Sequence, residues 1–186
     1  MIEPNESNER DAPSKLRYPI GQFAPPEVYT SILRERYLTE LAACPGELRR
    51  AVAGLSETQL DTPYRAQGWT VRQVVHHVPD SHMNAYVRHK LATTEEQPAI
   101  RLYDEALWAE LPEARTAETE LSLTLLAALH ARWDRFLRSL AEETFARTFL
   151  HPSLGPVTLD QSVGMYAWHS RHHVAQIDAL RRCNGW

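Results

Sequence analysis

Hydrophobic residues recur at intervals of three and four positions in four long segments of the chain. Because an α-helix has 3.6 residues per turn, this spacing puts the apolar side chains of each segment on one face. We therefore predict four amphipathic helices, the third extending from about residue 118 to residue 140. The apolar positions are Leu38, Leu41, Cys44, Leu48, Val52 and Leu55 in the first segment, Val71, Val74, Val78 and Ala85 in the second, Leu126, Leu129, Trp133, Phe136 and Leu140 in the third, and Val163, Ala167, Ser170, Val174 and Ile177 in the fourth.

The second and fourth segments each begin with a Thr-x-x-Gln sequence. Thr70 is followed by Gln73, and Thr158 is followed by Gln161. The side chains of such a pair can hydrogen-bond backbone amides that the first helical turn leaves unpaired. The sequence therefore predicts that the second helix opens at Thr70 and the fourth at Thr158.

Two kinds of break interrupt the helical pattern. Pro45 and Gly46 are expected to kink or interrupt the first helix, and Pro79 is expected to bend the second. Long connections, residues 93–114 and 143–157, separate the second helix from the third and the third from the fourth. No convincing series of strands is present. We therefore predict an all-α protein, a four-helix bundle with long connecting loops.

Composition and charge narrow the class of protein. The 186 residues are 43% hydrophobic and 24% charged, as expected of one soluble domain. Residues 1–16 are polar and predict a flexible N-terminal tail, followed by a single domain over residues 17–186. The net charge of −4 provides no basic surface for nucleic acid, and no apolar run approaches the ~20 residues that cross a membrane. Cys44 and Cys183 form no disulfide framework, which favours a cytoplasmic location.

Five histidines on two predicted helices are the main candidates for chemistry. At 100° per residue, His169 and His173 project one turn apart from the same flank of the fourth helix's apolar face. His77 lies on the flank of the second helix's apolar stripe. By the same geometry, His76 and His172 point away from the core, towards solvent.

This pattern predicts a site for one divalent metal ion. Two imidazoles four residues apart on one helix, completed by a third from another helix, can bind a transition metal and leave positions open for water or substrate. An isolated His-x-x-x-His is a weak motif, and a single histidine on a helix flank is more often structural. The combination of His77, His169 and His173 favours an enzyme. A non-catalytic metal-binding module and a bundle with incidental histidines are the alternatives.

Further residues are expected around this site. The connection after the second helix could supply Asp104 as a general base. His89 and His130 are interpreted as ordinary helix residues. The residues expected to support the ligands or to line a pocket are His82, Asn84, Arg88, His151 and Tyr166.

Several longer motifs resemble the YfiT-like branch of the DinB superfamily. In chain order they are YPIGQF, GWTVRQVVHHVPDSHMN, IRLYDEALWAELP, HPSLG and YAWHSRHHVAQI. The resemblance extends from about Tyr18 to Trp186 and implies a four-helix bundle with a three-histidine site for a divalent metal.

The resemblance also implies a ligand set and an activity. In the superfamily pattern the first ligand follows the Trp of the second helix by eight residues, and counting from Trp69 gives His77. The His-x-x-x-His pair corresponds to His169 and His173. The family further implies one divalent metal per chain, zinc or else nickel, a small-molecule substrate and a homodimer. Its implied activity is metal-dependent hydrolysis, and the alternative is S-transfer from a low-molecular-weight thiol of the bacillithiol type.

Overall fold

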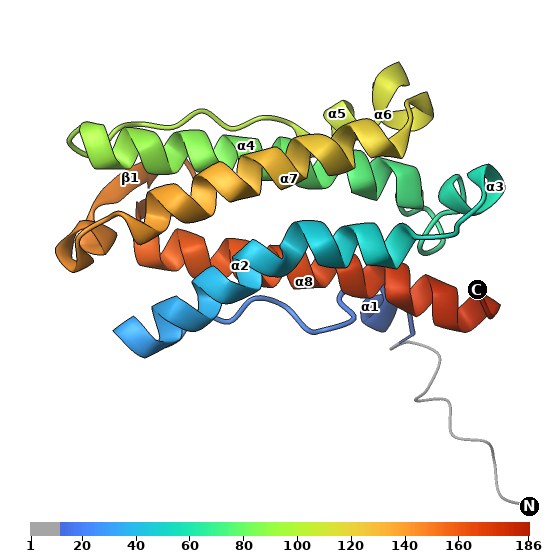
Figure 1. Ribbon diagram of the computed structural model, residues 1–186, viewed down its shortest axis with the longest axis horizontal. Coiled ribbons are helices and arrows are strands. Elements are labelled where there is room, and N and C mark those ends of the chain that lie inside the picture. The colour runs from blue at the N-terminus through green and yellow to red at the C-terminus, as the bar shows by residue number, and fades with distance from the viewer. Residues whose placement is uncertain (1–11) are drawn as a thin grey trace, which may run out of the picture.

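The computed structural model describes residues 12–186 of the chain. Four long helices lie side by side along its long axis (Figure 1). The predicted all-α four-helix bundle is therefore confirmed. The long helices are α2 (Ser31–Val52), α4 (Val71–Thr94), α7 (Thr119–Arg138) and α8 (Leu159–Asn184).

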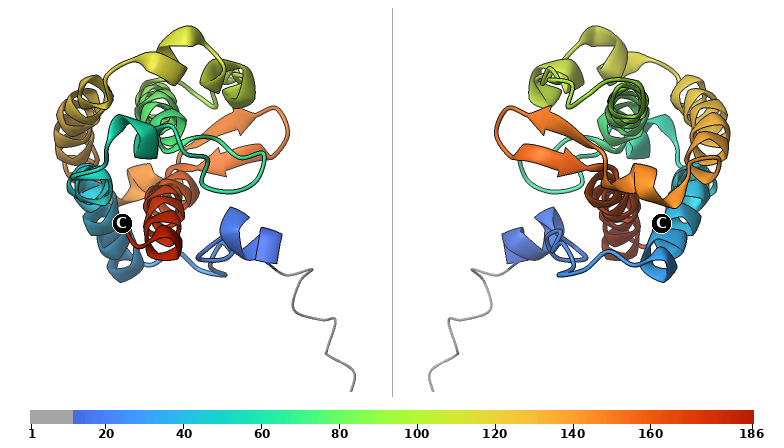
Figure 2. Two further views of the ribbon diagram at one scale, coloured as in Figure 1. Left: turned by 90° about the vertical axis from the view of Figure 1, so that its right-hand side faces the viewer. Right: turned by 90° about the vertical axis from the view of Figure 1, so that its left-hand side faces the viewer.

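The order of the helices explains the longest connection. α2 and α4 each contact both α7 and α8, and the end-on views show the four helices around a common core (Figure 2). α2 and α8 run in one direction, whereas α4 and α7 run in the other (Figure 1). Because α4 and α7 are parallel neighbours, the chain between them returns along the 24 residues of α4, a length of about 36 Å.

Short elements occupy the connections. The connection from α4 to α7 contains two short helices. The connection from α7 to α8 contains a two-stranded antiparallel hairpin, which packs on the outer side of α4 and α8 (Figure 2). The sequence predicted no strand there, because paired segments of four residues are too short to establish an alternating pattern. The short elements are α3 (Glu57–Leu60), α5 (Glu105–Ala109), α6 (Pro112–Thr116), the 3₁₀ helix η1 (Glu142–Ala146), β1 (Thr148–His151) and β2 (Gly155–Thr158).

The N-terminal segment differs from the predicted tail in its last part. Of that tail, residues 1–11 lie outside the described residues. Helix α1 (Ala12–Arg17) packs against α8, and the backbone carbonyl of Arg17 accepts a hydrogen bond from the side-chain amide of Gln176 at 3.0 Å. The end of the predicted tail is therefore part of the packed structure.

Both predicted capping pairs are present. The Thr70 hydroxyl accepts a hydrogen bond from the Gln73 N–H, and the Thr70 N–H donates to the Gln73 side chain. Thr158 and Gln161 form the same pair of bonds at the start of α8. In contrast to the expected interruption, α2 continues through Pro45.

A polar layer divides the core of the bundle. Trp133 belongs to one buried apolar cluster and Leu126, two turns earlier on α7, belongs to another. His130 lies between them on the same helix, and His82 and Ser170 occupy the corresponding level on α4 and α8. Buried polar groups are costly unless they are hydrogen-bonded, so the side chains of this layer are expected to have hydrogen-bond partners inside the bundle.

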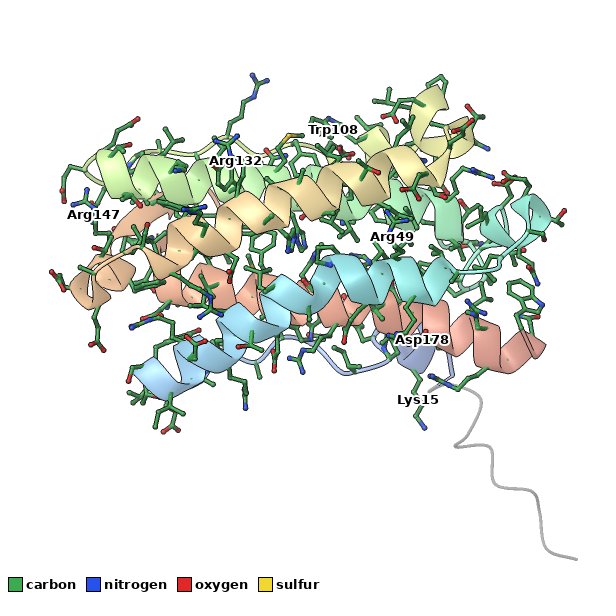
Figure 3. All side chains as sticks on the ribbon, viewed as in Figure 1. Lys15, Arg49, Trp108, Arg132, Arg147 and Asp178 are labelled. Carbon is green, nitrogen blue, oxygen red and sulfur yellow. The ribbon has the colours of Figure 1, made fainter. Side chains whose placement is uncertain are left out.

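The outer surface carries exposed ion pairs between helices. Arg49 of α2 donates two hydrogen bonds to Glu120 of α7 at 2.7 and 2.8 Å (Figure 3). Because both side chains are exposed, this pair contributes little to stability. None of the helices in residues 12–186 has the length and hydrophobicity needed to span a lipid bilayer.

Candidate metal centre

The contact between α4 and α8 brings three histidines together. His77 lies near the start of α4, and His169 and His173 lie in the middle of α8. The Nε2 atom of His169 is 3.3 Å from Nε2 of His77 and 3.1 Å from Nε2 of His173. One ring nitrogen from each histidine lies within 4.8 Å of the other two.

The spacing and charge of these nitrogens fit a divalent metal ion. Ligands 2.0–2.1 Å from a tetrahedral zinc ion are about 3.3–3.4 Å from one another, close to the observed separations. Burial, together with the charge of His172, lowers the pKa of His77 to about 4. Burial is also the main cause that holds the pKa values of His169 and His173 well below the usual range. All three imidazoles are therefore neutral at neutral pH, as metal binding requires.

Gln176 determines which nitrogen of His173 is free to bind. The Gln176 side-chain nitrogen donates to the backbone carbonyl of Arg17, which can only accept. Its side-chain oxygen therefore faces His173, and accepts a hydrogen bond from Nδ1 of that ring at 2.9 Å. With the proton on Nδ1, the lone pair of His173 is on Nε2. Sequence reasoning missed Gln176, although its position three residues after His173 on the same helical face was the available signal.

A cavity of about 630 Å³ adjoins the three histidines, all of which line it. The ring of Trp69 packs against His77 with 4.7 Å between ring centroids, and so holds this imidazole at the cavity wall. The aromatic residues that line the cavity are Tyr18, Tyr64, Trp69, Tyr103, Tyr166 and Trp168.

Positive charge predominates among the ionised side chains of the cavity wall. Arg17, Arg65 and Arg88 line the cavity, together with one carboxylate, Glu105. Among the residues that the structure describes, none of these three guanidinium groups forms an ion pair, whereas Arg34, for example, pairs with a carboxylate at 2.7 Å. Unpaired guanidinium groups in a concave site are suited to bind an anionic group.

Comparison with known proteins identifies the family. The model of the DinB superfamily matches residues 40–177 of the chain. This chain belongs to the DinB superfamily. The membership predicted from the motifs is therefore confirmed.

Close relatives of this DinB protein carry a common name. "Putative metal-dependent hydrolase YfiT" of Bacillus subtilis (strain 168) is 49% identical to it over 172 residues, covering 92% of this chain and 97% of the relative. A "Putative metal-dependent hydrolase" of Bacillus cereus (strain 03BB102) is also 49% identical, over 171 residues, covering 92% and 98%. The solved structure of YfiT, described as "a probable metal-dependent hydrolase with an unusual four-helix bundle topology", matches at a TM-score of 0.90 and 48% identity, covering 92% of this chain and 99% of that chain.

Four of the residues expected around the site lie beside it. Arg88, His151 and Tyr166 of this DinB protein line the cavity. His82 is buried behind the three histidines, where its Nε2 atom is 3.0 Å from Nδ1 of His169.

Two of the expected residues do not reach the site. Asn84 donates its side-chain amide to a backbone carbonyl one turn earlier on α4 and does not line the cavity. Asp104 is exposed and caps α5 by accepting a hydrogen bond from the Leu107 N–H at 2.9 Å, so the structure does not support it as a general base. The side chains that this connection contributes to the cavity wall include Tyr103 and Glu105.

His76 and His172 are buried, contrary to the prediction that they face solvent. The Nδ1 atom of His76 is 2.7 Å from the hydroxyl of Ser122 on α7. The ring of His172 stacks on Trp168 with 4.6 Å between centroids, and its Nε2 accepts a hydrogen bond from Gln176. Helical geometry alone leaves these faces to solvent, whereas α7 and the N-terminal segment cover them in the folded chain.

Proposed function

We propose that this DinB-superfamily protein is a metal-dependent hydrolase that holds one divalent ion, zinc, through His77, His169 and His173. The observation that carries the proposal is the meeting of three imidazole nitrogens, 3.1 and 3.3 Å apart, at the wall of a cavity large enough for a small-molecule substrate. The names of relatives at 49% identity support the same activity.

An open coordination position favours a reactive site over a structural one. When bound, a divalent ion with three imidazole ligands lowers the pKa of a coordinated water to about 7 or polarises a substrate carbonyl. A structural zinc site normally closes with four protein ligands. Within residues 12–186, the group around His77 comprises three candidate ligand side chains, and all three border the cavity.

Two phenols beside the site are suited to orient a polar substrate. Burial is the main cause that raises the pKa of Tyr103 to about 12, and burial also raises the pKa of Tyr166. Both phenols therefore keep their protons at neutral pH. Each can donate a hydrogen bond to a substrate carbonyl and to the negative charge that develops on its oxygen during hydrolysis.

The charge of the wall supports a substrate with an anionic group. Arg17, Arg65 and Arg88 face the same cavity as the histidines. Their charges attract a carboxylate or similar group and can hold it away from the reacting bond, so that the bond lies at the three histidines. The substrate class proposed is accordingly a small ester or amide that bears a negative charge.

The test is hydrolysis of paired substrates by the zinc-loaded protein. Esters and amides with and without a carboxylate are incubated with wild-type protein and with the His173→Ala variant, and the products are identified by mass spectrometry. We expect water-derived products from the wild type, faster for the anionic member of each pair, and none above background from the variant.

The same assay separates the alternative functions. Each substrate, together with a panel of electrophiles, is also offered with low-molecular-weight thiols. A product that carries the thiol's sulfur would identify the activity as S-transfer and not hydrolysis. If no turnover occurred with zinc, nickel, manganese or iron, the protein would be a non-catalytic metal-binding protein.

A further inference from the structure

Three hydrogen bonds connect His169 to the backbone on the far side of the bundle. Nδ1 of His169 is 3.0 Å from Nε2 of His82. Nδ1 of His82 is 2.8 Å from Nε2 of His130, and Nδ1 of His130 is 2.8 Å from the carbonyl oxygen of Leu41. We call these three hydrogen bonds the relay. The relay passes from α8 through α4 and α7 to α2, so it crosses the bundle along the polar layer that separates the two apolar clusters.

The backbone carbonyl of Leu41 determines which atom donates and which accepts in each hydrogen bond of the relay. A carbonyl oxygen can only accept, so His130 donates from Nδ1 and, being neutral, has its lone pair on Nε2. His82 must then donate from Nδ1 to that lone pair and accept on its own Nε2. His169 in turn donates from Nδ1 to His82. The proton positions of all three rings therefore follow from the single acceptor at Leu41.

We propose that His82 and His130 are positioning residues that hold His169 as the tautomer whose Nε2 is free to bind a metal ion. This inference rests on the ligand set of the proposed function, but it concerns the proton positions of the rings, which can be measured without any catalytic activity. Hydrogen bonds from a ligand histidine to a fixed partner commonly set the tautomer and orientation of metal-binding imidazoles. Here the partner of His169 is His82, which is itself held by His130 and, through it, by the main-chain carbonyl of Leu41.

The relay has a consequence when it is combined with Gln176. Gln176 fixes the lone pair of His173 on Nε2, and the relay fixes the lone pair of His169 on Nε2. These two nitrogens face one another at 3.1 Å with no proton between them. Two opposed lone pairs repel unless a cation lies between them, so the protein builds a site whose electrostatics are relieved by a metal ion.

The relay also decides against a second metal site in the same layer. Candidate ligand atoms of Cys44, His82 and His130 lie within 4.8 Å of one another. An ion there would take Nδ1 of His82, the atom that faces His130, and the remaining proton of that ring would move to Nε2. His82 would then donate to His169, whose proton would move to its own Nε2 and close that atom to the first ion. With neutral imidazoles the two groups cannot both bind metal, and burial, which raises the pKa of Cys44 to about 12, disfavours the thiolate.

The experiment compares two substitutions of His130 by zinc affinity, measured by competition with a chelator. His130→Leu leaves Nδ1 of His82 without an acceptor, and we expect zinc affinity to fall about 10- to 100-fold. His130→Gln supplies one acceptor and one donor, and we expect it to recover most of the wild-type affinity. Imidazole ¹⁵N NMR of the metal-free wild type should show His169 and His82 protonated on Nδ1, and His130→Leu should show mixed tautomers.

His89→Leu is the matched control. His89 is also wholly buried on α4, where it contacts the Ser162 hydroxyl at 2.7 Å and accepts from Trp133. It lies outside the relay, so its loss should lower stability without changing zinc affinity. Equal weakening in His89→Leu and His130→Leu, or a proton on Nε2 of His169 in the metal-free wild type, would overturn the relay.

The metal content separates this inference from the proposed function. We expect one zinc per chain in the wild type and an unchanged content and affinity in Cys44→Ser. Two zinc ions per chain, one of them lost in Cys44→Ser, would refute the relay and assign the layer to a second metal. A wild type that shows the expected tautomers and binds zinc but hydrolyses nothing would refute the proposed function alone.

Discussion

His77 and His169 place their Nε2 atoms 3.3 Å apart although 92 positions separate them in the chain. Each ring is held by neighbours in the protein itself. Trp69 packs on His77, and His82 contacts Nδ1 of His169. The packing of α4 against α8 therefore preorganises the site, so that metal binding need not assemble it.

The first prediction concerns the ligand set. His173→Ala removes one of the three proposed ligands, and we expect the protein to lose stoichiometric zinc, as measured by elemental analysis after dialysis. His172→Ala is the control, because His172 is adjacent, buried and also hydrogen-bonded to Gln176, but lies outside the group of three nitrogens. Full zinc occupancy in His173→Ala would contradict the assignment.

The second prediction is that the bundle survives removal of the metal. Both apolar clusters, around Trp133 and around Leu126, are buried and include none of the three histidines. Burial of apolar surface stabilises a fold by ~25 cal/mol per Å², so we expect these clusters to hold the four helices together without the ion. Far-ultraviolet circular dichroism should therefore keep most of its helical signal after chelation, while the melting temperature falls because a ligand of the folded state is lost. Wholesale loss of helix would make the site structural and would count against hydrolysis.

The helices and the shared face of His169 and His173 were predictable because they depend on neighbours in sequence. The Thr70–Gln73 and Thr158–Gln161 caps involve residues three positions apart, and His169 and His173 share a face through helical geometry alone. Such local relationships need no knowledge of the tertiary structure.

The missed features depend on contacts between distant elements. His130 reads as an ordinary helix residue until α7 packs its ring against His82 of α4. The spacing of His173 and Gln176 is visible in the sequence, but the amide atom that faces the His173 ring is set only by the distant carbonyl of Arg17. Asp104 belongs to the connection that does border the cavity, but the sequence could not show that this side chain would cap α5 instead of facing the site.

The third prediction concerns substrate charge. Arg88 lines the cavity and is not in an ion pair among the described residues, so its charge is available to a bound anion. For an anionic ester, Arg88→Ala should raise KM about tenfold, as expected from the loss of ~1–2 kcal/mol of charge-assisted hydrogen bonding, with a smaller effect on kcat. For the neutral analogue the change should be within about twofold. Arg132→Ala, which removes an exposed arginine outside the cavity lining, is the charge-matched control. Equal loss for both substrates would show that Arg88 supports the fold and does not bind the anion.

The fourth prediction is a pH dependence of stability that His89 contributes. Burial, with a smaller effect of the Arg88 charge, lowers the pKa of His89 to about 3 in the folded protein, whereas the ordinary value is about 6.5. Between these values the unfolded chain binds a proton that the folded protein does not. The contribution of neutral His89 to the free energy of unfolding is therefore fully present above about pH 6.5. It decreases by about 1.4 kcal/mol for each pH unit as the pH falls towards 3.

Urea unfolding of the metal-free protein at about pH 6 and pH 4 tests this prediction. His89→Gln should make the dependence of unfolding free energy on pH shallower by about 1.4 kcal/mol per pH unit, although the variant is less stable at neutral pH. Ser162→Ala removes the hydroxyl beside His89 but keeps the imidazole, so it should lower stability and retain the wild-type slope. If both variants kept the wild-type slope, His89 would not be the group whose protonation destabilises the fold. His89 lies outside the relay and the metal centre. A shallower slope in His89→Gln with unchanged zinc affinity would therefore show that this part of the pH dependence of stability arises in the core and not at the metal centre.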